Sequence, residues 1–175
     1  MRMIATPIMS LLSVLATGQL YAESVEIYLT DMLDSTQSGY CVDIAKGKGA
    51  DANPDDGLQS HTCYSPLGGI LVDQTFDTDR FADDILYMPE FDVCVQLTAS
   101  EPGATLALAP CDGSDEQSFK FSGEGTITPV SSPDLCFTAG EDTRSGRSDT
   151  NQIKTLTLES CSDKKSVYQV WAVRS

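Results

Sequence analysis

The chain has 175 residues and a formal net charge of −15 at pH 7, with 26 Asp and Glu against 11 Lys and Arg. A polypeptide of this length forms one domain or slightly more. The acidic balance argues against binding to nucleic acid or to anionic membrane surfaces, because both are negatively charged themselves.

The N-terminal segment 1–22 has the layout of a secretory signal peptide. Arg2 is its only charged residue, and a run of mostly Leu, Ile, Met, Ala and Val leads to the small residue Ala22. This apolar run is slightly short for a membrane span, which disfavours an uncleaved anchor. We therefore predict cleavage after Ala22, with Ala16 as the alternative site. The mature protein, residues 23–175, is expected to be secreted or periplasmic and not to insert into the membrane.

Short apolar or alternating segments, separated by residues typical of turns, follow one another along the mature chain. We expect strands at Val25–Leu29, Cys41–Ala45, Leu58–Tyr64, Ile70–Phe76, Val93–Thr98, Thr105–Cys111, Gln117–Phe121, Leu135–Ala139, Thr155–Cys161 and Tyr168–Val173. Lys46–Gly57 and Gly140–Asn151 are expected to be polar loops, the second without an apolar anchor. Asp77–Met88 is ambiguous and compatible with a helical turn. Many short strands with frequent turns predict an all-β sandwich or barrel.

A unit of two cysteines followed by a Gln-x-aromatic motif occurs three times. The motifs are Gln74-Thr75-Phe76, Gln117-Ser118-Phe119 and Gln169-Val170-Trp171. The six cysteines all follow the predicted signal peptide, and their even number indicates disulfides formed in an oxidising compartment. Six cysteines allow 15 pairings. The repeat selects the three within single units, which are Cys41–Cys63, Cys94–Cys111 and Cys136–Cys161.

The threefold repetition decides between a sandwich and a barrel. Three equivalent units can close a barrel around an axis, with Phe76, Phe119 and Trp171 as matching core residues. The sequence therefore predicts a β-trefoil of three disulfide-containing repeats. Their approximate ranges are 25–80, 81–125 and 126–175.

The repeats resemble those of the ricin B-type lectins, which carry a Gln-x-Trp signature, over about Val25–Arg174. The third repeat is the most similar, because it has Trp171 in the motif, where the first two repeats have Phe76 and Phe119. The resemblance implies a carbohydrate-binding module with a glycan as its partner. It implies that function only for repeats that retain the sugar-contacting residues.

In that family a sugar-binding repeat has an Asp two residues after its first cysteine, and a Gln and an aromatic residue four and two residues before its second. An Asn–Gln pair opens the Gln-x-Trp motif. In the first repeat these positions hold Asp43, Gln59, His61, Asp73 and Gln74, with His61 replacing a larger ring and Asp73 replacing Asn. A carboxylate accepts hydrogen bonds from two sugar hydroxyls, and an amide both donates and accepts. The resemblance therefore implies a sugar site made by these five residues.

The second and third repeats lack both the Asp and the stacking ring. The same positions hold Gln96, Ala107, Ala109, Glu116 and Gln117 in the second repeat, and Thr138, Thr157, Glu159, Tyr168 and Gln169 in the third. We therefore expect at most one sugar site. Each of the five residues also has a structural interpretation, and Gln74 in particular could hold the barrel by bonding to the backbone. The alternative function is a trefoil that binds no sugar and contacts another protein through its loops, as trefoil protease inhibitors do.

No other group of residues in the sequence predicts catalysis or a metal site. His61 is the only histidine, the cysteines lack zinc-type spacing, and no Gly-x-Ser-x-Gly motif supplies a nucleophile. The segment Asp51–Thr62 has the alternating oxygen ligands of a calcium loop, but Pro54 interrupts it and it ends on Thr rather than Glu. We expect a monomer without enzymatic activity, metal or cofactor.

Overall fold

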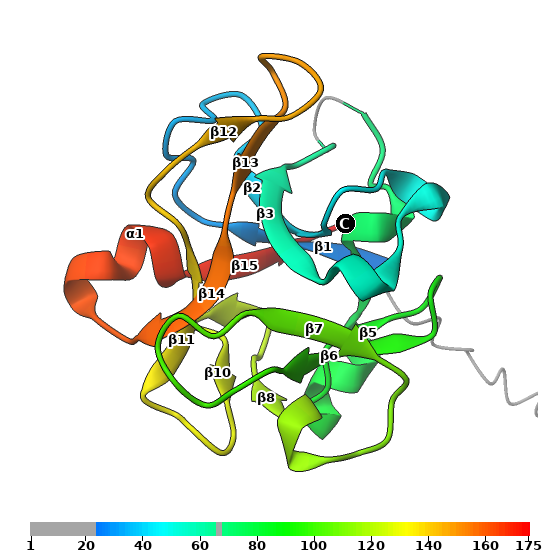
Figure 1. Ribbon diagram of the computed structural model, residues 1–175, viewed down its shortest axis with the longest axis vertical. Helices are drawn as coiled ribbons and strands as arrows, with labels where there is room; N and C mark the ends of the chain where they lie inside the picture. The colour runs from blue at the N-terminus through cyan, green and yellow to red at the C-terminus, as the bar shows by residue number, and fades with distance from the viewer. Residues whose placement is uncertain (1–23, 66–67) are drawn as a thin grey trace, which may run out of the picture.

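The computed structural model describes residues 24–65 and 68–175, so the predicted signal peptide lies outside the described residues. Short strands surround a common centre, with short helical turns between them (Figure 1). The strands are β1 Ser24–Leu29, β2 Tyr40–Ile44, β3 Leu58–Thr62, β4 Thr75–Asp77, β5 Tyr87–Met88, β6 Val93–Leu97, β7 Leu106–Ala109, β8 Phe119–Lys120, β9 Glu124–Gly125, β10 Thr128–Pro129, β11 Leu135–Ala139, β12 Arg144–Ser145, β13 Gln152–Lys154, β14 Leu156–Ser160 and β15 Trp171–Arg174. The helical turns are η1 Gly49–Asp51, η2 Pro54–Asp56, η3 Val72–Gln74, η4 Thr78–Asp83, η5 Asp115–Gln117, η6 Asp163–Lys165 and α1 Ser166–Gln169. Within these two ranges no helix has the length and apolar character needed to cross a membrane.

Each repeat is built on one antiparallel hairpin that carries its disulfide. The hairpins are β2–β3, β6–β7 and β11–β14. In each, the first cysteine lies on the first strand and the second cysteine lies just after the second strand. The disulfides are Cys41–Cys63, Cys94–Cys111 and Cys136–Cys161, which confirms the predicted pairing.

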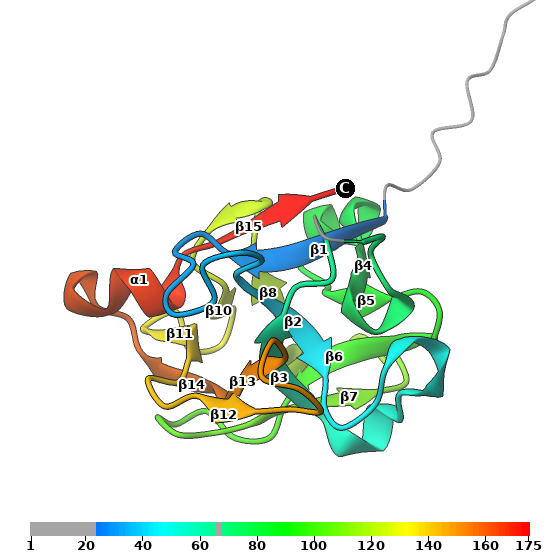
Figure 2. The same cartoon turned by 90° about the horizontal axis from the view of Figure 1, so that it is seen from above.

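Strand β1 connects the first repeat to the third. It pairs with β15, where Leu29 lies opposite Trp171, and also with β4, where Val25 lies opposite Phe76. A further pair joins Tyr28 to Cys41 in β2. Figure 2 shows β1 and β15 running side by side along one edge of the molecule. The two ends of the trefoil are therefore closed through backbone hydrogen bonds.

The aromatic residues of the three motifs form the centre of the core. Phe76, Phe119 and Trp171 are each at most 1% exposed, which confirms their predicted role. The Trp171 indole Nε1 donates to the Phe137 carbonyl at 3.1 Å. The Phe119 ring meets the Phe137 ring edge to face, with 5.3 Å between centroids, a favourable aromatic geometry.

Three segments predicted as strands begin differently from the prediction. Ile70–Phe76, Gln117–Phe121 and Tyr168–Val173 are expected to be extended throughout, but η3, η5 and α1 occupy their starts. In every repeat the helical turn ends on the Gln of the motif, and the aromatic two residues later lies in the following strand. The turn points the Gln side chain inward. Because Gln is polar, the pattern of apolar residues does not predict this turn.

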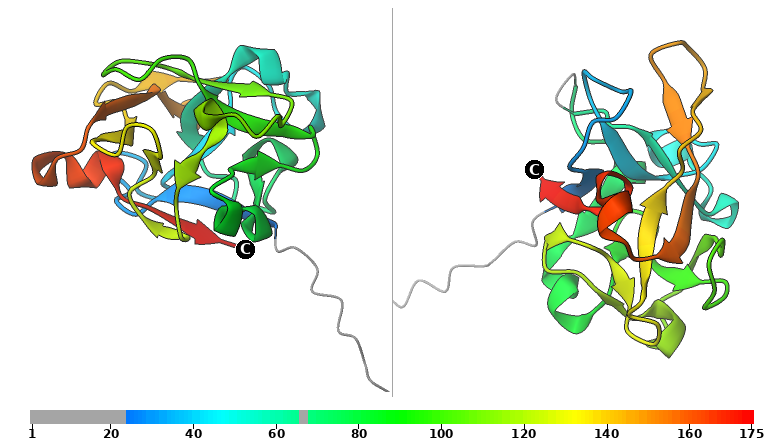
Figure 3. Two further views of the ribbon diagram at one scale, coloured as in Figure 1. Left: turned by 90° about the horizontal axis from the view of Figure 1, so that it is seen from below. Right: turned by 90° about the vertical axis from the view of Figure 1, so that its left-hand side faces the viewer.

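The predicted polar loop Gly140–Asn151 contains part of a hairpin. Arg144 pairs with Ile153, and Ile153 also pairs with His61 of β3. The β12–β13 hairpin of the third repeat therefore extends the sheet of the first repeat, and it projects at one end of the molecule (Figure 3). Ile153, which is 7% exposed and lies two residues beyond the predicted loop, is the buried apolar residue of this hairpin. Residues 141–150 are exposed, so the predicted loop itself has no apolar anchor, as expected.

The two other irregular segments contain short helical turns. Lys46–Gly57 includes η1 and η2, and the Asn53 side chain caps η2 by accepting a hydrogen bond from the Asp55 backbone N–H at 3.2 Å. Asp77–Met88 includes η4, so the helical turn considered there is confirmed.

The Gln of each motif clamps its hairpin through its buried side chain. Its carbonyl oxygen accepts from the backbone N–H that follows the second cysteine, and its amide donates to the carbonyl that precedes this cysteine. These partners are Tyr64 and Thr62 for Gln74, Asp112 and Pro110 for Gln117, and Ser162 and Ser160 for Gln169, at 2.9–3.3 Å. The amide also donates to the side chain two residues after the first cysteine, which is Asp43, Gln96 or Thr138.

We expect Gln117→Leu to lower the free energy of unfolding by about 1–3 kcal/mol, because it removes the three hydrogen bonds that this buried amide makes to Asp112, Pro110 and Gln96. Denaturant unfolding with the disulfides intact measures the change. Gln37→Leu, at an exposed position, is the control. Equal stability of the two variants would contradict a structural role for the clamp.

Candidate functional site

The first repeat brings three of the predicted site residues into one hydrogen-bonded group. The register of β2 and β3 places Asp43 opposite Gln59. The Gln59 amide donates to Asp43 Oδ1 at 2.7 Å, and the Gln74 amide donates to Asp43 Oδ2 at 2.9 Å. Both carboxyl oxygens of Asp43 therefore already accept hydrogen bonds within the protein.

This group is buried. Asp43 is 1% exposed and Gln74 is fully covered, whereas Gln59 is 5% exposed. Burial raises the pKa of the Asp43 carboxyl to about 8, although the hydrogen bonds from the two glutamines oppose this rise. Asp43 thus presents almost no surface, and its carboxyl holds the Gln59 and Gln74 amides.

His61 and Asp73 lie beside this group. The His61 ring is 7% exposed, and its Nδ1 lies 2.8 Å from the Thr62 carbonyl. A carbonyl can only accept, so Nδ1 carries the proton. Burial disfavours the charged form of both groups. It therefore lowers the pKa of His61 and raises the pKa of Asp73, which is fully covered. The ring of Tyr64 lies 5.5 Å from the His61 ring, centroid to centroid.

A cavity of about 240 Å³ opens in front of Gln59 and His61. Its walls come from the loop after β2, from the end of β3 and from the β12–β13 hairpin. The lining residues are Lys46, Gly47, Lys48, Gln59, His61, Tyr64, Arg144, Ser145, Gly146, Arg147, Asn151 and Ile153. Of the five predicted residues, Gln59 and His61 therefore line the cavity, while Asp43, Asp73 and Gln74 lie behind it.

Arg144 is a site residue that the sequence does not reveal. Its Nη2 donates to Gln59 Oε1 at 3.1 Å, so the Gln59 amide is held at both ends, by Asp43 on one side and by Arg144 on the other. Arg144 is separated from Gln59 by 85 positions and lies in a predicted loop. The only hint in the sequence is the presence of two arginines in that loop of a strongly acidic chain.

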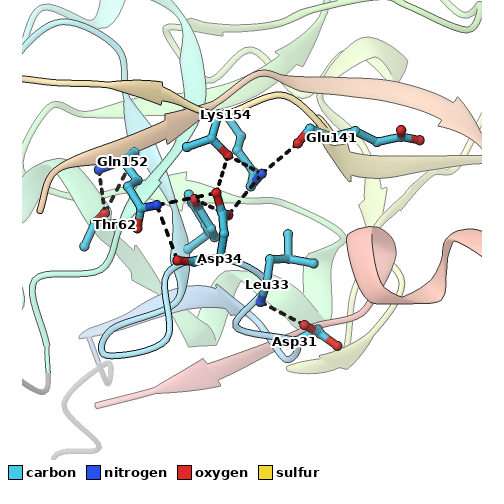
Figure 4. Close-up of polar contacts among 9 residues, drawn as sticks. Asp31, Leu33, Asp34, Thr62, Glu141, Gln152 and Lys154 are labelled. Carbon is cyan, nitrogen blue, oxygen red and sulfur yellow. Dashed lines mark hydrogen bonds and ion pairs between the residues drawn. The ribbon is translucent and has the colours of Figure 1, made fainter. Parts of the chain in front are cut away.

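The hairpin that carries Arg144 is fastened to the first repeat by Lys154 (Figure 4). Lys154 is 3% exposed, and its Nζ lies 3.2 Å from Asp34 Oδ1. It also donates to the Glu141 carbonyl at 2.9 Å and to Thr143 Oγ1 at 2.6 Å. Burial by itself would raise the pKa of Asp34, but hydrogen bonds from Thr143, Tyr40 and Lys154 outweigh it and lower the pKa to about 2.

The equivalent place in the third repeat also contains a cavity, of about 220 Å³. Thr138, Thr157, Glu159 and Tyr168 line it together with neighbouring loop residues. Here the Thr138 hydroxyl accepts the hydrogen bond from the Gln169 amide, and Thr157 occupies the position of Gln59, so no amide is present there. The amide and the imidazole at the cavity wall therefore distinguish the first repeat.

A profile of the ricin-type beta-trefoil lectin domain matches residues 86–175, which is more than half of the chain. The chain belongs to this family. The β-trefoil fold and the resemblance seen in the sequence are therefore confirmed. The matched region comprises the second and third repeats, so the match does not extend to the candidate site in the first.

Solved structures support the fold of this lectin domain. A designed threefold-symmetric protein, ThreeFoil, has a TM-score of 0.56 at 16% identity, covering 87% of this chain and 98% of its own. The earthworm R-type lectin C-half in complex with GalNAc has a TM-score of 0.53 at 17% identity, and the match covers 86% of this chain and 98% of the lectin chain. The agglutinin from Abrus precatorius has a TM-score of 0.57 at 19% identity, and the match covers 87% of this chain and 48% of the agglutinin chain. None of the curated proteins matches the chain. At these identities the likeness shows the fold alone.

The buried Asp43 should make the stability of the lectin domain depend on pH. Its folded pKa of about 8 lies above the unfolded value of about 3.9, so folding takes up a proton between these values. The stabilisation from this proton is complete below about pH 4 and is lost as the pH rises to about 8. Relative to Asp43→Asn, the wild type should therefore lose up to about 1.4 kcal/mol per pH unit in this window.

Urea unfolding of both proteins between about pH 5 and pH 9 measures this difference. Asp142→Asn, which removes the same charge from an exposed position, is the control. Parallel pH profiles for wild type and Asp43→Asn would contradict a raised pKa of the Asp43 carboxyl.

Lys154→Met should release the β12–β13 hairpin, because it removes the buried ammonium that Asp34 and Thr143 hold, while a side chain of similar length remains. We expect faster amide hydrogen exchange in residues 144–154 and little change elsewhere. Lys120→Met breaks an exposed ion pair with Asp84 and is the control. Unchanged exchange in the hairpin would show that Lys154 does not fasten it.

Proposed function

We propose that the chain is an exported, non-enzymatic carbohydrate-binding module with a single sugar site in its first repeat, formed by Asp43, Gln59, His61, Asp73 and Gln74. Gln59 and His61 face the ligand. Asp43, Asp73 and Gln74 support them from behind. The observation that carries this proposal is the Gln59 amide, which stands at the wall of a cavity and is held by hydrogen bonds at both ends.

This geometry suits a sugar for a definite physical reason. An amide held in one orientation offers a fixed donor and a fixed acceptor, and a sugar ring displays hydroxyl groups that are both. The rings of His61 and Tyr64 provide flat surfaces beside this amide. Because the amide is already ordered in the free protein, binding does not incur the entropy cost of ordering it.

Export is supported by two independent features. The segment 1–22 has the composition of a signal peptide. The three disulfides require an oxidising compartment to form and persist. We propose that the mature module, residues 23–175, acts outside the cytoplasm as a secreted or periplasmic monomer.

A single small site predicts weak binding, on the order of millimolar. The purified mature protein should therefore be screened on a glycan array in multivalent form and then titrated with the best sugar by calorimetry. Gln59→Ala and His61→Ala should each lower the affinity about tenfold or more, since each removes a group that faces the cavity. Thr157→Ala and Glu159→Ala, at the equivalent positions of the third repeat, should leave it unchanged.

Two results would overturn the proposal. Loss of binding in the Thr157 or Glu159 variants would move the site to the third repeat. Failure to bind any sugar at millimolar concentration would remove the carbohydrate function and favour a trefoil that contacts another protein through its loops.

A further inference from the structure

The cavity of the candidate site is positively charged, although the chain as a whole is strongly acidic. Lys46, Lys48, Arg144 and Arg147 line it, which is four of the 11 Lys and Arg of the chain. Among the described residues that line it, none is an Asp or a Glu. Such a concentration of one sign of charge at a cavity, against a net charge of −15, favours a ligand of opposite charge.

Most of this positive charge is available to a ligand. Lys46 is neutralised by Asp56, at 2.6 Å. Within residues 24–65 and 68–175, no ion pair engages Lys48, Arg144 or Arg147. The Lys48 ammonium lies 5.3 Å from the centroid of the Tyr64 ring, which keeps it near the cavity without cancelling its charge.

Arg144 is held in place before any ligand arrives. Its backbone pairs with Ile153 in the β12–β13 hairpin, and its guanidinium donates one N–H to Gln59. Gln59 is itself fixed by Asp43. A guanidinium has five N–H donors in a planar fork, so most of them remain for a ligand. Such a fork matches the two oxygens of a carboxylate or of a sulfate.

Two acidic side chains of the candidate site, Asp43 and Asp73, do not line the cavity. Asp43 and Asp73 lie behind Gln59 and His61 and are at most 1% exposed. Burial raises the pKa of both carboxyls.

We propose that the sugar bound in the first repeat is negatively charged, and that Arg144, Arg147 and Lys48 bind its carboxylate or sulfate group while Gln59 and His61 contact its ring. This inference rests on the proposed carbohydrate-binding function and specifies the class of sugar. Two of the three cations come from the third repeat, so the site is shared between repeats and depends on the β12–β13 hairpin.

Matched neutral and anionic sugars test the proposal in calorimetric titrations of the mature protein. Lactose is compared with 6′-sialyllactose, which adds a carboxylate, and galactose with galactose 6-sulfate, which adds a sulfate. At least one anionic sugar should bind about tenfold or more tightly than its neutral parent, as a charge-assisted hydrogen bond allows. This advantage should shrink as the salt concentration rises from about 50 mM to about 500 mM.

The double variant Arg144→Gln/Arg147→Gln should reduce the ratio of anionic to neutral affinity about tenfold. Arg80→Gln/Lys120→Gln removes two positive charges from η4 and β8, and it is the matched control that should preserve the ratio. Inorganic sulfate, the free anion, should compete far more weakly than the sulfated sugar.

Each contrary result has a distinct meaning. Equal affinity for neutral and anionic sugars would overturn the inference and leave the carbohydrate function intact. Competition by inorganic sulfate as strong as that by the sulfated sugar would overturn it as well, since the cavity would then bind a simple anion. An equal fall in the ratio of anionic to neutral affinity in the Arg80→Gln/Lys120→Gln control would also overturn the inference, because the preference would then arise from net charge rather than from the cavity. Absence of binding to any sugar would overturn both this inference and the proposed function.

Discussion

The hydrogen bonds made by the three buried motif glutamines are the constraint on which the rest of the structure depends. Gln74, Gln117 and Gln169 each join the backbone on both sides of the second cysteine to the side chain two residues after the first cysteine. A buried amide must be satisfied on every polar atom, or the fold is destabilised by the unpaired group. Each hairpin is therefore fixed against its helical turn by one side chain together with one disulfide, and the aromatic residue that follows is directed into the core.

In the first repeat the same constraint orders the candidate site. The side chain that accepts the hydrogen bond from the motif Gln here is the Asp43 carboxyl. A carboxyl has two oxygens and accepts from two amides, whereas the Thr138 hydroxyl of the third repeat accepts from one. The second amide is that of Gln59, and its carbonyl oxygen in turn accepts a hydrogen bond from Arg144 at the cavity wall. A continuous series of hydrogen bonds thus leads from the core to the cavity. Asp43 belongs to the inner part of this series, which explains why it is buried.

The β12–β13 hairpin breaks the threefold symmetry at the cavity of the first repeat. The hairpin belongs to the third repeat, yet it pairs with β3 of the first repeat and brings Arg144 and Arg147 in front of Gln59. The buried Lys154 holds it there through Asp34 and Thr143 (Figure 4). The equivalent place in the third repeat has no such cover from a neighbouring repeat among its described lining residues, and its lining includes Glu141 and Glu159. The two cavities therefore differ in the charges of their lining residues.

The sequence by itself determined the three disulfides, the three core aromatics and the family, because these depend on spacings that recur in every repeat. The resemblance to the family also grouped Asp43 with Gln59 and Gln74, and the β2–β3 ladder does place Asp43 opposite Gln59. The tertiary structure alone decided that Asp43 is buried, that each motif Gln ends a helical turn and that Arg144 lies against Gln59. The position of Arg144 depends on pairing between repeats, as between β13 and β3, and the burial of Asp43 depends on the packing around it. Such contacts join residues far apart in the chain, so no local pattern in the sequence records them.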